Sequence, residues 1–238
     1  SSDASSSDAS SSDASSSDDS SSANPIAAGA FHNCAILDNA SVNCWGRSNL
    51  GNLGIGTTDD RGNEPGEMAA LSSINLGTGR TATSISGGNV HTCALLDNAS
   101  VKCWGHGGNG RLGQGNTNDL GDGANEMGDN LPSIDLGTGR TATATAAGGA
   151  HSCAILDNGS VKCWGKNDFG QLGLDYTPDN LGYQPGEMGD NLSSINLGTG
   201  RTATAIAAGI HHSCAILDNG SVKCWGLNDF GQLGIDNT

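Results

Sequence analysis

The sequence predicts an all-β protein made of small antiparallel sheets in tandem, and three observations support this class. A segment of about 60 residues recurs from residue 26 onward, and a fixed period of this length is typical of repeat architectures. Glycine supplies 38 of the 238 residues without a collagen period, which indicates many tight turns and many short strands. Apolar and polar residues alternate within the recurring segment, which favours half-buried strands.

The repeat divides the chain into an arm and four units. The first cysteine of each copy falls at positions 34, 93, 153 and 214, so the period is 59 to 61 residues. Each copy continues through a Gly-x-Leu-Gly element, and the first three then reach Ser-Ile-Asn-Leu-Gly-Thr-Gly-Arg or a close variant. We assign an extended Ser/Asp-rich arm to 1–23, whole units to 24–84, 85–144 and 145–205, and a partial unit to 206–238.

Within each unit the pattern predicts four short strands. Cys-Ala-Ile-Leu and Val-Lys-Cys-Trp flank Asp-Asn-Gly-Ser, where Asn and Gly accept the positive φ of a hairpin turn. Two further strands are expected near Ser-Ile-Asn-Leu and Thr-Ala-Thr-Ala-Ile, on either side of a Gly-Thr-Gly-Arg turn. A four-stranded sheet of this size cannot stand alone, so the units must stack on their neighbours.

The whole pattern, A-x-G-x-x-H-x-C-A-I-L-D-N-G-S-V-K-C-W-G-x-N-x-x-G-Q-L-G, resembles the regulator of chromosome condensation repeat family over residues 24–238. It is most similar to the cysteine-containing copies of secreted and surface proteins. The resemblance implies β-propeller blades of about four strands, usually about seven to a ring. With three whole units and a truncated fourth, one chain cannot close such a ring. The chain is either part of a longer protein, or its blades stack between subunits.

All eight cysteines form C-x9-C pairs, for which we expect intra-hairpin disulfides. A hairpin centred on Asn39 places Cys34 opposite Cys44 if the loop is odd-numbered, whereas a two-residue loop would shift the register by one. An even count in an exported chain favours bridges, and the alternative is eight buried thiols. The expected pairs are Cys34–Cys44, Cys93–Cys103, Cys153–Cys163 and Cys214–Cys224.

A histidine and a tryptophan also recur in every unit. Zinc is disfavoured, because the C-x2-C spacing is absent and no fourth ligand is evident beside His32, Cys34 and Cys44. We expect the histidines to bond backbone at the turn before each strand, and the tryptophans to pack between blades; the alternative is a sugar-stacking platform. These residues are His32, His91, His151 and His212, and Trp45, Trp104, Trp164 and Trp225.

The arm and the hairpin tips carry candidate glycosylation sites. Residues 1–22 hold 14 Ser, five Asp and three Ala in a five-residue repeat, which is typical of a disordered linker or an O-glycosylated stalk. N-x-S sequons recur at the tips, although Asn also suits the turn itself. The candidates are Ser1, Ser2, Ser5, Ser6, Ser7, Ser10, Ser11, Ser12, Ser15, Ser16 and Ser17, and Asn39, Asn98, Asn158, Asn191 and Asn219.

The formal charge of −15 excludes several partners. Ten Lys and Arg residues give no basic footprint for nucleic acid or an anionic membrane, and no apolar stretch reaches the roughly 20 residues of a membrane span. A cation, a carbohydrate or a basic protein surface fits better. The long loops have no EF-hand spacing, but their oxygens are candidate calcium ligands. The candidates are Asp59, Asp60, Asp119, Asp122, Asp175 and Asp179. Covalent glycans are expected, and no other cofactor or metal.

No unique Ser, His and Asp trio stands out from the repeated scaffold residues, so the sequence predicts no enzyme. It favours an extracellular or cell-surface structural glycoprotein, in the form of a fibre or filament subunit that self-associates through open blade edges or the arm. The alternative is a secreted adhesion- or inhibitor-like propeller that binds a protein or carbohydrate. A guanine-nucleotide exchange factor, as the resemblance to nuclear members suggests, fits less well with oxidisable cysteines. The chain starts at Ser1 without a signal peptide, as a mature form or a fragment would.

Overall fold

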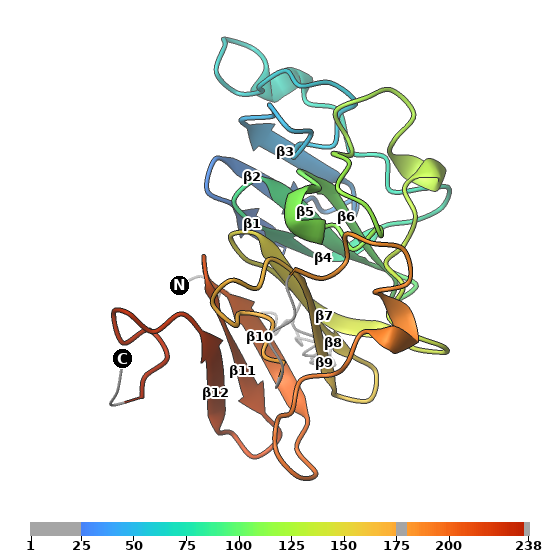
Figure 1. The fold of residues 1–238 in the computed structure, drawn as a ribbon. Helices are drawn as coiled ribbons and strands as arrows, with labels where there is room; N and C mark the ends of the chain where they lie inside the picture. The colour runs from blue at the N-terminus through green and yellow to red at the C-terminus, as the bar shows by residue number, and fades with distance from the viewer. Residues whose placement is uncertain (1–24, 175–179, 236–238) are drawn as a thin grey trace, which may run out of the picture.

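The computed structural model describes residues 25–174 and 180–235, which form four three-stranded antiparallel sheets, called blades 1 to 4 (Figure 1). Blade 1 holds β1 (Ile26–Ala28), β2 (His32–Ile36) and β3 (Val42–Gly46), and blade 2 holds β4 (Ala82–Gly87), β5 (His91–Leu96) and β6 (Val101–Gly105). Blade 3 holds β7 (Ala142–Ala147), β8 (His151–Leu156) and β9 (Val161–Gly165), and blade 4 holds β10 (Ala203–Ala208), β11 (His212–Leu217) and β12 (Val222–Gly226). The all-β prediction is therefore confirmed.

The loops between blades contain short 3-10 turns. These are η1 (Met68–Ala70), η2 (Gly108–Gly110), η3 (Gly128–Asn130) and η4 (Gly189–Asn191). No helix in the described part of the chain has the length and apolar character needed to cross a membrane. The Ser/Asp arm, with its candidate serines, lies outside the described residues, as do Asp175 and Asp179.

Each blade has three regular strands. In blades 1 to 3 this is one fewer than predicted, and the missing one is the outer strand at Ser-Ile-Asn-Leu or its variant. That segment contacts the sheet edge through a single backbone bond, from Ile74 N to Val42 O at 2.7 Å in blade 1. Side chains occupy the neighbouring backbone groups: Asn75 Oδ1 accepts from Gly77 N, and Leu76 O accepts from Lys102 Nζ. A ladder cannot extend there, although Ile74 and Leu76 are buried as the alternation predicts.

The hairpin that joins the second and third strands has the odd-numbered loop that the cysteine spacing requires. Ile36 pairs with Val42 and Cys34 with Cys44, so Asn39 lies at the centre of a five-residue loop. Leu37 N donates to Ser41 O at 2.8 Å, and Ala40 has φ of 61°. Its counterpart Gly159 has φ of 75°. A residue with positive φ before the returning strand is the bulge that fixes this register.

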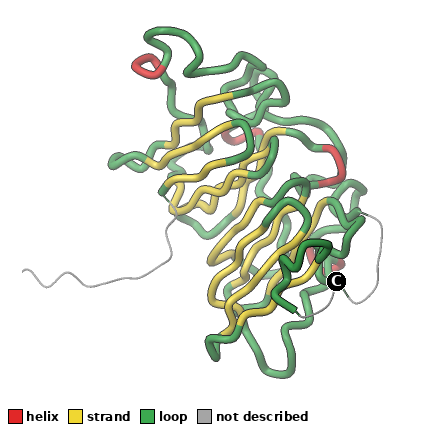
Figure 2. The backbone as a smooth tube through the Cα atoms, turned by 90° about the vertical axis from the view of Figure 1, so that its left-hand side faces the viewer, coloured by secondary structure: helices red, strands yellow, loops and turns green. Residues whose placement is uncertain are grey.

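The blades stack in chain order, with the inner strands β1, β4, β7 and β10 side by side (Figures 1 and 2). Three apolar clusters lie between successive blades, and each combines residues from two neighbours. We call the side of a blade that meets the following blade its forward face, and the side that meets the preceding blade its receiving face. In the third cluster, Ile155 and Val161 of the forward face of blade 3 meet Leu217 and Trp225 of blade 4.

Candidate functional site

A chain of hydrogen bonds crosses every interface between described blades. His32 Nε2 of blade 1 lies 2.7 Å from Thr92 Oγ1 of blade 2, and that hydroxyl donates to Asn52 O at 2.9 Å. Because the hydroxyl proton goes to the carbonyl, the imidazole supplies the other proton from Nε2. The expected side-chain bond to backbone is therefore wrong for His32, and likewise for His91 and His151, while no contact of the His212 ring tests it. The equivalent pairs are His91 with Ser152 at 2.9 Å and His151 with Ser213 at 2.8 Å.

These three histidines are neutral donors at physiological pH. Burial lowers the pKa of His32 and of His151 to about 4. It also holds the pKa of the fully buried His91 well below the usual range. Each ring packs on the glycine three residues earlier: a Cβ at Gly29 would lie 2.5 Å from His32 Cε1 and 2.5 Å from Gly88 O. The A-x-G-x-x-H spacing thus reflects close packing between blades, since only glycine leaves that space.

Trp104, Trp164 and Trp225 pack in the interfaces between blades, as predicted for core residues, whereas Trp45 has no described blade against it. Trp104 and Trp164 are fully buried and cannot stack on a sugar. Trp164 Nε1 donates to Arg111 O of the preceding blade at 3.0 Å, and Trp225 Nε1 donates to Gln171 O at 2.9 Å. The second glycine of the first three Gly-x-Leu-Gly elements accommodates the ring of the next blade: a Cβ at Gly113, for example, would lie 2.9 Å from Trp164 Nε1.

A lysine and an aspartate secure the outer side of the interface between blades 1 and 2. Lys102 Nζ donates to Leu76 O at 2.9 Å and to Gly128 O at 2.8 Å. Asp129 accepts from Thr78 N at 2.8 Å and from Thr78 Oγ1, and these bonds hold the pKa of Asp129 below its usual value. Burial lowers the pKa of Lys102, while Asp129 opposes this shift. Lys162, Asp190 and Thr138 repeat the arrangement between blades 2 and 3.

Every C-x9-C pair is joined by a disulfide in the structure, across the second and third strands of its blade. The Cα atoms are 4.1 Å apart in Cys34–Cys44, Cys93–Cys103 and Cys153–Cys163 and 4.0 Å apart in Cys214–Cys224. None of the eight cysteines, all of them in the described residues, is a free thiol. The sulfurs of blades 1 to 3 are buried within the clusters between blades. The bridges therefore clip single hairpins and also shape the forward faces.

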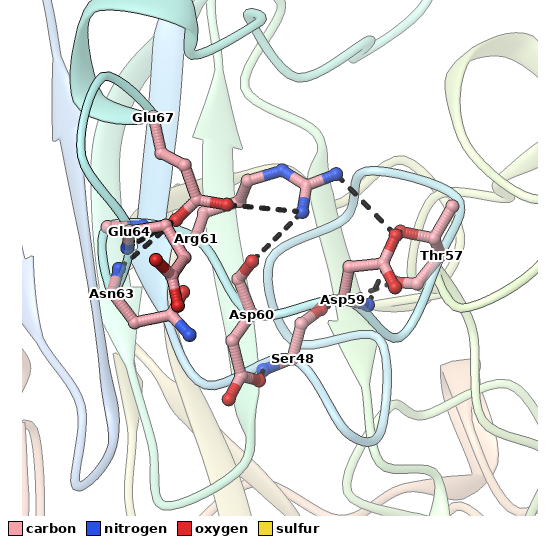
Figure 3. A network of polar contacts seen from close by, with 9 residues as sticks. Ser48, Thr57, Asp59, Asp60, Arg61, Asn63, Glu64 and Glu67 are labelled. Atoms are coloured by element: carbon pink, nitrogen blue, oxygen red, sulfur yellow. Dashed lines mark hydrogen bonds and ion pairs between the residues drawn. The ribbon is translucent and has the colours of Figure 1, made fainter.

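The acidic loop of blade 1 is held together by its own polar groups (Figure 3). Asp60 Oδ1 accepts from Ser48 N at 2.8 Å, and Asp59 lies 3.6 Å from the Arg61 guanidinium. Glu67 Oε2 accepts three backbone N–H groups, from residues 62, 63 and 64, and these bonds lower its pKa, the one from residue 64 most. These carboxylates organise the loop backbone.

The loop of blade 2 uses its first aspartate in a similar way. Asp119 Oδ1 accepts from Gly107 N at 2.8 Å and lies 2.8 Å from His106 Nδ1. Burial raises the pKa of Asp122, and the neighbouring Glu126 adds to the shift. Across residues 25–174 and 180–235, no three His, Cys, Asp or Glu side chains come together as a metal site would require. Calcium binding by these aspartates stays a prediction.

The sequon asparagines at the hairpin tips have a structural role. Asn39 Oδ1 accepts from Ser41 N at 3.1 Å and from Ser41 Oγ at 2.7 Å. The same pair of bonds recurs at Asn98, Asn158 and Asn219. Asn191 instead donates from Nδ2 to Gly186 O at 2.8 Å. The turn therefore explains these tip residues without a glycan, and glycosylation stays a prediction.

Two faces of the stack have no described neighbour. The forward face of blade 4 exposes Ile216 and Val222, and the receiving face of blade 1 exposes Leu37 and leaves Trp45 partly exposed. Their equivalents Ile155, Val161, Leu156 and Trp164 are buried in the interfaces of blade 3. Each of these two faces therefore corresponds to one side of the interface that recurs between blades 1 and 2, 2 and 3, and 3 and 4.

All three phenylalanines are exposed at the end of the blades where the histidine strands begin, which we call the loop end. Phe31 precedes β2, Phe169 follows β9 and Phe230 follows β12, with exposed fractions of 55%, 42% and 91%. His32 pairs with Gly46 in register, so the segments before β2 and after β3 share this end. The Arg47 guanidinium lies 5.6 Å from the centre of the Phe31 ring, and the Phe169 ring lies 4.8 Å from that of His211.

Stacked antiparallel blades with shared apolar clusters define a repeat protein of the β-propeller type. Comparison with known families agrees: the regulator of chromosome condensation (RCC1) repeat matches residues 26–52, 82–111, 142–171 and 203–232. A second description of the same repeat matches 40–95 and 158–216. The chain belongs to the RCC1 repeat family, as the motif resemblance predicts.

Relatives of the chain are larger proteins. It is 35% identical over 211 residues to the ultraviolet-B receptor UVR8 of Arabidopsis thaliana, covering 88% of this chain and 42% of that protein. It is 29% identical over 214 residues to the E3 ubiquitin-protein ligase HERC2 of Homo sapiens, covering 90% of this chain and 4% of the ligase. The chain thus spans less than half the length of these relatives.

Solved structures share the fold. Human WBSCR16 superposes with a TM-score of 0.69 at 18% identity, over 89% of this chain and 49% of that one. Yeast RCC1 (Prp20), solved with Kap60, gives a TM-score of 0.62 at 21% identity, over 88% of this chain and 44% of that one. At such identities the likeness shows the propeller-type fold alone.

The sequence pattern did not predict the hydrogen bonds that side chains form between neighbouring blades. A hydroxyl residue directly follows the histidine in the last three units, as Thr92, Ser152 and Ser213, and this recurrence was an available signal. The partners of Lys102 and Asp129 had no such signal, because they are distant in sequence and come from the neighbouring unit.

Proposed function

We propose that the chain is an extracellular, non-enzymatic module that binds a partner protein at its loop end. The observation that carries this proposal is the exposure of Phe31, Phe169 and Phe230 at that end. Aromatic residues make up 4% of the chain, and two of the four tryptophans are fully buried between blades. Aromatic residues are enriched at protein-binding surfaces, and these three exposed rings share one end of the blades.

The relatives support a binding role over a catalytic one. One is named a receptor for ultraviolet-B and another a ubiquitin ligase, and the chain matches 42% of the first and 4% of the second. Repeats shared by proteins of such different activity serve as scaffolds, while the activity depends on specific sites or other domains. The same reasoning disfavours guanine-nucleotide exchange inferred from fold alone.

The extracellular location is proposed from the disulfides, one in each of the four blades, since such bridges persist in oxidising compartments. Glycans on the arm serines and on tip asparagines such as Asn98 belong to this proposal. The intact mass of protein secreted by the native host, measured before and after enzymatic deglycosylation, tests the glycans. An unchanged mass would contradict glycosylation.

Site-specific photo-crosslinking tests the loop end. A photoreactive phenylalanine analogue at Phe169 should give adducts with one protein of the native extracellular fluid, and Phe31→Ser should weaken them. The matched control places the analogue at Asn98, an exposed tip at the opposite end of its blade. Equal adducts from both positions, or none from Phe169, would contradict binding at the loop end.

A second candidate function is that of a surface fibre subunit. The uncovered apolar faces of blades 1 and 4 favour it, because unpartnered faces promote association. Electron microscopy of the purified chain tests it: filaments are expected, and a field of single particles at high concentration would argue against a fibre.

A further inference from the structure

We propose that the forward face of blade 4 binds the receiving face of blade 1 of a second copy, so that chains associate head to tail. Blade 1 of the second copy would occupy the position of a blade that follows blade 4. This inference deepens the second candidate function and rests on the faces of the sheets; it shares Phe31 and Phe230 with the loop end but does not involve Phe169 in the contact between copies. It specifies which residues meet and in which register.

The forward face of blade 4 repeats a surface that already binds a blade. Strands β11 and β12 read HSCAIL and VKCWG, identical to β8 and β9 of blade 3. In blade 3, Ile155 and Val161 are buried against the receiving face of blade 4. Because Ile216 and Val222 occupy the same places on the same scaffold, they present the same apolar surface to a neighbour.

The receiving face of blade 1 carries the residues that such a neighbour supplies. Leu37 corresponds to Leu156 and Leu217, which are buried in interfaces. Met68 corresponds to Met188, whose Cε would lie 3.1 Å from a Cβ at Gly113 of the preceding blade. At Gly234, the counterpart of Gly113 in blade 4, a Cβ would meet nothing within 4 Å. The space that Met68 and Trp45 would fill is therefore open in blade 4.

The polar residues of the two faces also match. His212 would bond the position that Thr92, Ser152 and Ser213 occupy in the second to fourth blades, and in blade 1 this position is Asn33. An amide reproduces both roles of the hydroxyl, because Oδ1 accepts from the imidazole and Nδ2 donates to the carbonyl of the preceding blade. That carbonyl is Gln232 O, the counterpart of Gln171 O, which accepts from Ser213 Oγ at 3.2 Å.

An aromatic contact at the loop end continues across the same interface. Phe169 of blade 3 contacts His211 of blade 4. The corresponding residues across the proposed interface are Phe230 of one copy and Phe31 of the next, which are both exposed. Two exposed aromatic residues thus occupy the positions that hold the Phe169 and His211 rings at the interface between blades 3 and 4.

The interface is heterologous, because two different faces meet, and each copy offers one of each. Such contacts build rings if the rotation closes and filaments if it does not. Either form requires both faces on every interior copy. Association between two identical faces would instead stop at a dimer, and this difference gives the proposal a specific test.

The test uses the 238-residue chain in analytical ultracentrifugation at increasing concentration. Val222→Asp blocks the forward face of blade 4, and Leu37→Asp blocks the receiving face of blade 1. Both positions are exposed, so the monomer should fold, which circular dichroism checks. We expect wild type to form species larger than 23.8 kDa and each single variant to stay monomeric. A mixture of the two variants should form a one-to-one dimer, because each retains the face that the other lacks.

Two further variants control the result. Asn158→Asp adds the same charge at an exposed tip of blade 3, keeps the acceptor for the serine, and should associate like wild type. Asn33→Ala should weaken association about tenfold through the loss of a buried hydrogen bond, and Asn33→Ser should restore it. A monomeric wild type, a variant mixture that stays monomeric, or self-association of either blocked variant would overturn the proposal.

Discussion

Blades 3 and 4 contain the same strand sequences in different surroundings. Ile155 of β8 is 2% exposed and Val161 of β9 is fully buried, whereas Ile216 of β11 is 45% exposed and Val222 of β12 is 65% exposed. The hairpin register and the disulfide are the same in both blades. The hairpin is therefore a local property of the sequence, and burial is a property of the neighbour.

The comparison also separates two sources of stability. Each blade gains from its own turn and bridge, which need no neighbour. Each interface adds apolar burial, a histidine–hydroxyl bond and a tryptophan packed on a glycine. Blade 3 has both contributions on both faces, and blade 4 lacks the second on its forward face. Substitutions at matched positions in the two blades can measure the interface contribution directly.

The largest expected difference is between Ile155→Ala and Ile216→Ala. The first leaves a cavity between blades 3 and 4 and should lower the free energy of unfolding by about 3 kcal/mol. The second removes a half-exposed side chain and should cost about 1 kcal/mol or less. Urea denaturation at concentrations where the chain is monomeric measures both. Equal losses would mean that the two faces are not distinct in solution.

Acid should weaken the interface between blades 3 and 4, where His151 is buried. Burial lowers the pKa of His151 to about 4, so the unfolded chain, at about 6.5, takes up this proton first as the pH falls. The contribution of the neutral histidine to the free energy of unfolding is therefore fully present above about pH 6.5 and decreases as the pH falls towards 4, by on the order of 3 kcal/mol. When urea denaturation is measured between pH 7 and 4, the free energy of unfolding should fall less steeply with decreasing pH in His151→Gln than in wild type. An unchanged slope would exclude His151 as a source of the pH dependence.

Reduction should distinguish the disulfides of the two blades. Each bridge closes a short loop and should contribute about 2–3 kcal/mol in the chain-entropy description. The cysteines of blades 1 to 3 are buried, whereas Cys214 and Cys224 are partly exposed. Mild reductant without denaturant should therefore open Cys214–Cys224 first, as detected by alkylation and peptide mass spectrometry. Simultaneous opening of all four would show that the faces of blades 1 to 3 are not protected.

The smallest expected effect concerns the hairpin tips. Ala40 has φ of 61° and Ala99 has φ of 61°, where blades 3 and 4 have Gly159 and Gly220. Ala99→Gly should raise stability by about 0.5–1 kcal/mol, because glycine adopts positive φ without a steric cost.

The reverse substitutions return to the two blades. A Cβ at Gly159 would lie 2.5 Å from Thr202 Cβ, and one at Gly220 would meet nothing within 4 Å. Gly159→Ala should thus lower the Tm more than Gly220→Ala. If both lowered it equally, only the backbone conformation would matter at this position.

The sequence alone determined the repeat, the hairpin and the cysteine pairs. Alternation and turn residues act over a few positions, so Cys34 and Cys44 meet wherever the hairpin forms. Only the tertiary structure decided that His32 bonds Thr92 and that Lys102 binds Leu76 O. It also decided that Ser-Ile-Asn-Leu is no strand, because side chains occupy the backbone groups that a ladder would need. The sequence of a strand does not predict whether its forward face is buried, because burial depends on the blade that packs against that face.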